Sequence, residues 1–126
     1  MVKRAYEMNE DPVREERIDY EIVVDAYNSE EREMGWYYHL DDKLKFPFTA
    51  ECGMRRTSSP LKVGQSVKIL RMAPEEECQR EMMVMVKWQD GKLAVPLSQL
   101  IPVAADAGTV EGVEDWRYWV AMGYEF

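Results

Sequence analysis

A Phe-Pro-Phe step at residues 46–48 divides the chain into a helical part and a strand-rich part. Before it, in the segment 34–45, apolar residues recur at helical spacing among acidic residues; after it, apolar and polar residues alternate as they do in strands. Pro47 ends any helix that reaches it, because proline has no backbone N–H to donate. The sequence therefore predicts an α+β fold in which a helical segment leads directly into a β body.

The first helix is predicted over residues 12–27. Asp11 followed by Pro12 is a typical helix start, with the aspartate as N-cap and the proline in the first turn. Apolar residues then recur at spacings of three and four, which gives the helix one apolar face. That face comprises Tyr20, Val23, Val24 and Tyr27, widened by Ile18, Ile22 and Ala26.

A second helix is predicted over residues 29–42, after a break at Asn28. Gly35 is unfavourable inside a helix and is a candidate for a bend. The two helices would form a hairpin over residues 12–45, and the polar residues 1–10 ahead of it are expected to be flexible. The apolar face of the second helix consists of Trp36, Tyr37, Leu40 and Leu44.

The β body is predicted over residues 46–103 as a small SH3-like barrel. Asp90-Gly91 is a strong signal for a two-residue hairpin turn. Pro96 cannot continue a central strand, so a short 3₁₀ turn is expected there before the last strand. Five short strands are expected, at 46–52, 67–72, 80–88, 93–95 and 101–103. In the second of them, Val67, Ile69 and Arg71 are expected on one face and Lys68, Leu70 and Met72 on the other.

A last helix is predicted over residues 109–122, with Thr109 as its cap and Gly123 as its stop signal, and it would pack on the barrel. Aromatic residues are dense here, at 116–119, and in the second helix, at 36–38. Aromatic rings bury large areas, so these two groups are expected to form the seam between helices and barrel. A ligand-stacking surface is the alternative.

The length of 126 residues fits one domain, 1–126, with a core of its own. No apolar run reaches the roughly 20 residues of a membrane span, and the first residues lack the apolar stretch of a signal peptide, so a cytoplasmic protein without a membrane partner is expected. The two cysteines, Cys52 and Cys78, are expected to be reduced and buried. The single histidine, His39, has no neighbour at metal-ligand spacing.

Charge excludes one class of partner. The net charge is −8, which argues against nucleic acid, because nucleic-acid binders concentrate positive charge. The exception is residues 51–73, a basic band that carries five bases and one acid. This band either binds an acidic partner or pairs with the acidic helices; the sequence leaves both open.

No motif for catalysis is present: the sequence has no G-x-S-x-G, no H-E-x-x-H, no phosphate-binding glycine loop and no Cys-His pairing, so an enzyme is not expected. The EF-hand pattern is also absent. A Ca²⁺ site would have to be assembled from carboxylates of distant segments. A merely solvated acidic surface explains the same residues.

The order of several short motifs resembles the cyanobacterial calcium-binding protein family CcbP. These motifs are EIVVDAY, GWYY, FPFTA and DWRYWV, and the resemblance extends over residues 14–126. It implies a small acidic protein that binds Ca²⁺ on its surface without an EF-hand, as an intracellular buffer or sensor. The ligands suggested by the matching motifs are Asp41, Asp42, Asp106 and Asp115, with Glu75 and Glu77 as weaker candidates. The alternative is an SH3-like protein-interaction module whose acidic surface only keeps it soluble.

Overall fold

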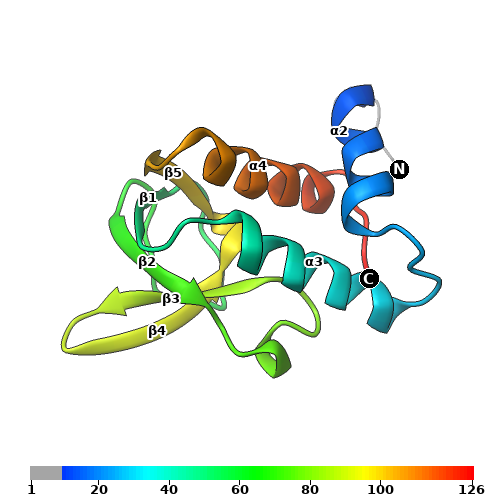
Figure 1. The fold of residues 1–126 in the computed structure, drawn as a ribbon. Helices are drawn as coiled ribbons and strands as arrows, with labels where there is room; N and C mark the ends of the chain where they lie inside the picture. The colour runs from blue at the N-terminus through cyan, green and yellow to red at the C-terminus, as the bar shows by residue number, and fades with distance from the viewer. Residues whose placement is uncertain (1–9) are drawn as a thin grey trace.

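The computed structural model describes residues 10–126, so the expected flexibility of 1–10 lies outside the described residues, except at Glu10. Two long helices, α3 and α4, lie side by side over an antiparallel sheet, and α2 lies at the end of this pair that points away from the sheet (Figure 1). No described helix is long and apolar enough to cross a membrane. The elements are α2 Pro12–Arg17, η1 Ile18–Ile22, α3 Ser29–Lys43, β1 Phe48–Cys52, β2 Ser66–Met72, η2 Glu75–Glu77, β3 Met83–Trp88, β4 Gly91–Pro96, η3 Leu97–Gln99, β5 Leu100–Ala104 and α4 Ala107–Ala121.

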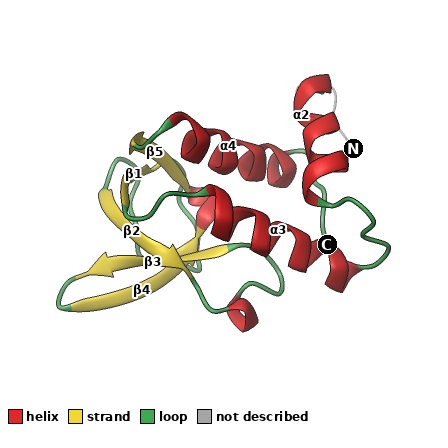
Figure 2. Cartoon of the chain, in the orientation of Figure 1, coloured by secondary structure: helices red, strands yellow, loops and turns green. Residues whose placement is uncertain are grey.

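The five strands form one antiparallel sheet in the order β4-β3-β2-β1-β5 (Figure 2). The predicted 3₁₀ turn is η3, and after it β5 returns to pair with β1. Five short antiparallel strands in an α+β fold are therefore confirmed. The SH3-like barrel is not confirmed, because in the described part of the chain β4 and β5 are the two edges and the sheet is open.

The tight hairpin is confirmed, but its turn lies one residue earlier than expected. Trp88 pairs with Gly91, so the two turn residues are Gln89 and Asp90, not Asp90 and Gly91. Gln89 adopts the left-handed conformation, with φ of 51°. The glycine thus belongs to the strand.

A bulge in β2 corrects the predicted faces of that strand. Ile69 pairs with Val86, but Arg71 pairs with Met85, and the register shifts between them. Met72 is therefore buried on the same face as Ile69, whereas Arg71 is exposed. Strict alternation predicted the reverse for both, because an extra residue in one strand exchanges the faces of all the residues that follow it.

The N-terminal helical hairpin is not confirmed. The first helix starts as predicted, with the Asp11 side chain accepting from Arg14 N, but it widens to a π-helix at Ile18 and ends at Ile22 instead of 27. Only Ile18 and Ile22 of the predicted face are buried; the exposed members include Tyr20, Val24 and Tyr27. The second helix, α3, lies beside α4 and not along α2 (Figure 1). The short first helix instead crosses the end of α4.

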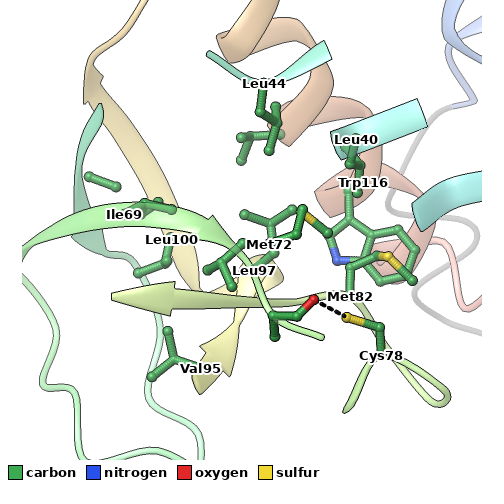
Figure 3. Packing of buried hydrophobic residues seen from close by; sticks show 14 of the residues in the cluster. Leu40, Leu44, Ile69, Met72, Cys78, Met82, Val95, Leu97, Leu100 and Trp116 are labelled. Atoms are coloured by element: carbon green, nitrogen blue, oxygen red, sulfur yellow. Dashed lines mark hydrogen bonds between the residues drawn. The ribbon is translucent and has the colours of Figure 1, made fainter. Parts of the chain in front are cut away.

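The aromatic seam is confirmed for its tryptophans, which pack between α3 and α4, whereas Tyr38 is exposed. Trp36 from α3 and Trp116 from α4 are 0% and 1% exposed, with ring centroids 4.9 Å apart at 72°. Leu40 of α3 and Leu44, the residue directly after this helix, continue the buried face towards the sheet (Figure 3). Burying two indoles at the centre of the helix layer fixes α3 and α4 relative to each other.

The last helix begins two residues before the predicted start and is capped by another side chain. Asp106 Oδ1 accepts from Thr109 N at 2.7 Å, so Asp106 is the N-cap. Thr109 is buried, and its hydroxyl accepts from Lys45 N at 2.9 Å, which joins the end of α3 to the start of α4. Gly123, with φ of 85°, ends the helix as predicted.

Candidate metal centre

The side of α3 that faces the β2–β3 connection carries acidic residues around one tyrosine. Tyr37 donates its hydroxyl hydrogen to Ala73 O at 2.8 Å and so ties α3 to the start of η2. Burial raises the pKa of Tyr37, and so do the nearby carboxylates of Asp41 and Glu75. A residue of α3 and a residue of η2 thus act electrostatically on the same phenol.

Glu33 is the acid most affected by this arrangement. Its side chain lies on the buried side of α3 and the residue is only 9% exposed. Burial raises the pKa of Glu33, and the charges of Glu75 and Glu30 raise it further. Since a raised pKa means that the charged form is disfavoured, Glu33 is an anion that would gain from a cation beside it.

The η2 segment carries two of the predicted acids, Glu75 and Glu77, and both act on the Cys78 thiol that follows them. Burial raises the pKa of the Cys78 thiol to about 11, opposed by a hydrogen bond from Met83 N and supported by the charges of Glu33, Glu77 and Glu75. The thiol therefore lies among three carboxylates. We call Glu33, Asp41, Glu75 and Glu77 the α3–η2 acidic cluster; no described lysine or arginine forms an ion pair with any of them.

Asp41 and Asp42 lie near different side chains. Both are exposed near the end of α3. Asp41 influences Tyr37, whereas Asp42 influences His39, whose pKa is lowered by burial and by Lys43. Side chains of successive helix residues point about 100° apart, so two adjacent aspartates face different neighbours. Asp41 belongs to the α3–η2 acidic cluster and Asp42 does not.

Asp115 is fully buried and already holds two cations. Arg14 Nη1 donates to Oδ1 at 2.6 Å, and Arg17 donates through Nε to Oδ2 and through Nη2 to Oδ1, both at 2.8 Å. The hydrogen bond to Asp115 is the main reason why the pKa of Arg17 is raised. In this conformation Asp115 joins α2 to α4 and is not the surface carboxylate that the resemblance suggested.

Asp106 is exposed but committed to capping α4. The backbone hydrogen bond from Thr109 lowers the pKa of Asp106, and Lys45 adds a smaller effect in the same direction. Nearby, Lys43 Nζ lies 2.7 Å from Glu111 Oε1. The two lysines make this end of α3 less favourable for a cation than the η2 side.

Of the six predicted ligands, the structure brings Asp41, Glu75 and Glu77 to one side of α3. Glu33 is not among the predicted ligands, although its position has a sequence signal: it precedes Trp36, Tyr37 and Leu40 at the spacing of the apolar face. An acid on a buried helical stripe is unusual and calls for a partner. Among residues 10–126, however, no three His, Cys, Asp or Glu side chains converge closely enough to hold an ion as they stand.

The donor chemistry nevertheless suits Ca²⁺. Ca²⁺ takes six to eight oxygen ligands in a flexible geometry, and waters and backbone carbonyls complete incomplete carboxylate sets. The exposed Glu77 side chain can rotate, while Glu33 is held by its burial. Asp41 lies eight residues from Glu33 on α3, about 12 Å along its axis, which is too far for the two carboxylates to share one ion.

Comparisons with known proteins agree with this chemistry. A family model for CcbP, described as "Calcium binding", matches residues 16–120. The crystal structure of Anabaena CcbP is similar, with 41% sequence identity, a TM-score of 0.83, and coverage of 94% of this chain and 98% of that one. A structure described as "Calcium binding protein in the calcium-binding form" is also 41% identical, with a TM-score of 0.80 and coverage of 92% and 95%. The search of curated proteins gave no match.

Proposed function

Since the chain belongs to the CcbP family of calcium-binding proteins, we propose that it binds Ca²⁺ through surface carboxylates, without an EF-hand, as an intracellular buffer. The observation that carries the assignment of ligands is the position of Glu33, which is buried on α3 near the charge of Glu75; both effects raise its pKa. A dication between these groups would remove the repulsion and stabilise the charged form of Glu33.

The proposed ligands are Glu33, Glu75 and Glu77 of the α3–η2 acidic cluster, with waters and main-chain oxygens completing the shell. Asp41 is too far from Glu33 along α3, and the proposal does not extend to it or to three other residues suggested by the sequence. Asp115 is occupied by two guanidinium groups, Asp106 caps a helix beside lysines, and Asp42 lies on the other side of α3.

A buffer fits the architecture better than a sensor. A sensor must change conformation on binding, whereas a buffer need only bind. The cluster joins α3 to η2, which the hydrogen bond from Tyr37 to Ala73 O already holds together. An ion there would strengthen an existing contact and need not move an element, so the backbone change is expected to be local.

The alternative, a protein-interaction module using exposed aromatic rings, loses its main support. It required a large apolar patch over Trp36, Tyr37 and Trp116, because an exposed patch of that kind marks a binding surface. Both tryptophans are buried and Tyr37 is half-buried. The two buried indole rings stabilise the helix layer and are not available for stacking on a partner.

Calorimetric titration with Ca²⁺, with Mg²⁺ as the control, tests the proposal. We expect heat with Ca²⁺, a rise in melting temperature because the ion binds only the folded state, and a weaker response to Mg²⁺, which demands a tight octahedral shell. The absence of both heat and a melting shift at millimolar Ca²⁺ would refute Ca²⁺ binding. Backbone amide resonances should shift only around α3 and η2; shifts across the sheet would favour a sensor.

Paired variants locate the site. Glu33→Gln combined with Glu75→Gln removes two charges from the cluster, and Glu51→Gln combined with Asp90→Asn removes two charges from β1 and from the β3–β4 turn. We expect the first variant to lose the calcium-dependent rise in melting temperature and the second to retain it. If both variants respond like the unmodified protein, the ion binds elsewhere and the assignment of ligands is wrong.

A further inference from the structure

The outer face of the sheet carries a row of three lysines on three adjacent strands. Lys87 of β3 pairs directly with Lys92 of β4. Ile69 of β2 pairs with Val86, and continuing that register by one residue brings Lys68 opposite Lys87. All three lysines are exposed, and none forms an ion pair with a described residue.

The β2 bulge adds a fourth cation to this face. Arg71 pairs with Met85, which in turn pairs with Ala94, so a second row runs parallel to the lysines and is mainly apolar beyond its arginine. Without the extra residue in β2, Arg71 would point to the core side together with Ile69. We call Lys68, Lys87, Lys92 and Arg71 the basic sheet face. Lys68 and Arg71 come from the basic band, whereas Lys87 and Lys92 lie outside it.

This arrangement opposes the stability of the fold. Like charges directly opposite each other on paired strands are destabilising, and here Lys87 has a lysine neighbour on both sides. The acid on the same face is Glu51 of β1, whose partner Ser66 lies two residues from Lys68. The chain as a whole has a net charge of −8, so a row of cations with no acid among them is a local concentration of positive charge. This concentration does not stabilise the fold.

We propose that the basic sheet face binds an acidic amphipathic helix of a partner protein. Adjacent strands are about 4.8 Å apart, so the three lysines stand at about 0, 5 and 10 Å along the row. A helix rises 1.5 Å per residue, so carboxylates at positions i, i+3 and i+7 stand at about 0, 4.5 and 10.5 Å. A helix laid across the strands therefore matches each lysine with one carboxylate, and its apolar edge meets Met85 and Ala94.

Two other polyanions fit this face less well. Single-stranded nucleic acids are held by aromatic side chains interleaved with basic ones, and the neighbours of the lysine row on this face are Thr49, Met85 and Ala94. A membrane surface requires protruding apolar or aromatic anchors, whereas Met85 is half-buried. The acidic α3–η2 cluster is on a different part of the molecule, so this inference does not depend on Ca²⁺ binding.

The probe is an alanine-based helical peptide with glutamates at i, i+3 and i+7 and a flanking leucine, titrated into the isotope-labelled full chain at low salt. We expect amide shifts confined to β2, β3 and β4 and a loss of affinity as salt is raised. A peptide with glutamine at the three positions should bind at least tenfold more weakly. Equal binding of the two peptides, or no shifts at millimolar peptide, would overturn the proposal.

Matched protein variants identify the surface. Lys68→Gln, Lys87→Gln and Lys92→Gln together should raise the Kd for the acidic peptide at least tenfold. The control combines Lys45→Gln, Arg55→Gln and Lys62→Gln, three exposed bases outside the row, and should change the Kd less than twofold. A larger effect of the control would refute the assignment. The variant of the row should also melt at a higher temperature, which shows that lost binding is not lost folding.

The competing occupants give distinguishable results. A single-stranded oligonucleotide that binds more tightly than the acidic peptide, and loses this binding in the triple variant, would identify nucleic acid as the occupant. Binding to phosphatidylglycerol vesicles in preference to the peptide would point to a membrane. Self-association in sedimentation that disappears in the triple variant would identify a second copy of this chain as the occupant. Each of these three results overturns the proposal.

Discussion

Arg17 holds the buried carboxylate of Asp115 through two hydrogen bonds of 2.8 Å, one to each oxygen. Arg14 adds a third, at 2.6 Å to Oδ1. The three residues join the short first helix to α4, and Tyr118 of α4 extends this contact by donating to Glu15 at 2.5 Å. A polar cluster therefore fixes the N-terminal segment where an apolar hairpin was expected.

Asp115→Ala should destabilise the fold by about 3 kcal/mol, because removing one partner from a buried ion pair leaves the other partners uncompensated. The measurement is chemical unfolding at neutral pH, with the exposed Asp42→Ala as the control, expected to change stability by less than about 0.5 kcal/mol. Ca²⁺ binding by the folded Asp115 variant should persist. A loss of binding with an unchanged fold would reinstate Asp115 as a ligand.

Glu33→Gln should raise the melting temperature at pH 7 in the absence of Ca²⁺. The pKa of Glu33 is raised in the folded state, so the native protein holds its proton more tightly than the unfolded chain does. This group therefore costs stability as the pH rises from the ordinary glutamate pKa through the raised one, and the cost persists above it. Below the ordinary pKa, Glu33 is protonated in both states, and the difference between variant and parent should shrink.

Thermal melts of both proteins from pH 4 to pH 8 test this prediction. Addition of Ca²⁺ at pH 7 should reverse the order of stability, because only the parent retains the carboxylate. A variant that melts below its parent at pH 7 without Ca²⁺ would show that the environment of Glu33 favours its charged form.

Lys87→Glu should stabilise the protein by about 0.2–1 kcal/mol, because it replaces like-charge pairs with Lys68 and Lys92 by opposite-charge pairs. The gain should be larger at low salt, where exposed charges are less screened. Lys62→Glu changes the net charge equally from a loop and serves as the control. Equal melting shifts in both variants would mean that the net charge matters and the row does not.

Two glycine-to-alanine changes in helices should have opposite effects. A Cβ on Gly35 would lie 2.5 Å from the carbonyl oxygen of Ile22, a backbone atom, so Gly35→Ala should be destabilising. A Cβ on Gly108 in the first turn of α4 meets nothing closer than 3.7 Å, so Gly108→Ala should stabilise by up to about 1 kcal/mol through helix propensity. Unfolding midpoints in urea separate the two; a stabilised Gly35→Ala would contradict the close approach of η1 and α3.

Gly35 also illustrates what propensity could not reveal. From the sequence it was a candidate for a bend, but α3 continues through it from Ser29 to Lys43. A glycine is needed here because the backbone of Ile22, the last residue of η1, packs directly against α3 at this point. A contact between two segments decides the role of this residue, and no local pattern contains that contact.

The sequence by itself determined the local features of this protein. Asp11 with Pro12 starts a helix, the stripe of Trp36, Leu40 and Leu44 is buried, and five short antiparallel strands with a tight hairpin follow. Each depends on the preferences of neighbouring residues and on a spacing of two or of three to four, which the sequence displays directly. The order of its motifs also pointed to the calcium-binding family.

The tertiary structure decided which distant side chains meet. It placed Asp115 between two arginines, put Asp41 near Tyr37 but Asp42 near His39, and brought Glu33 near Glu75, 42 positions further along the chain. One bulged residue in β2 also moved Arg71 to the outer face beside the lysine row. Which charged groups meet, and which face of the sheet a residue takes, depend on contacts between distant segments. These contacts follow from how α3, α4 and the sheet pack around one core.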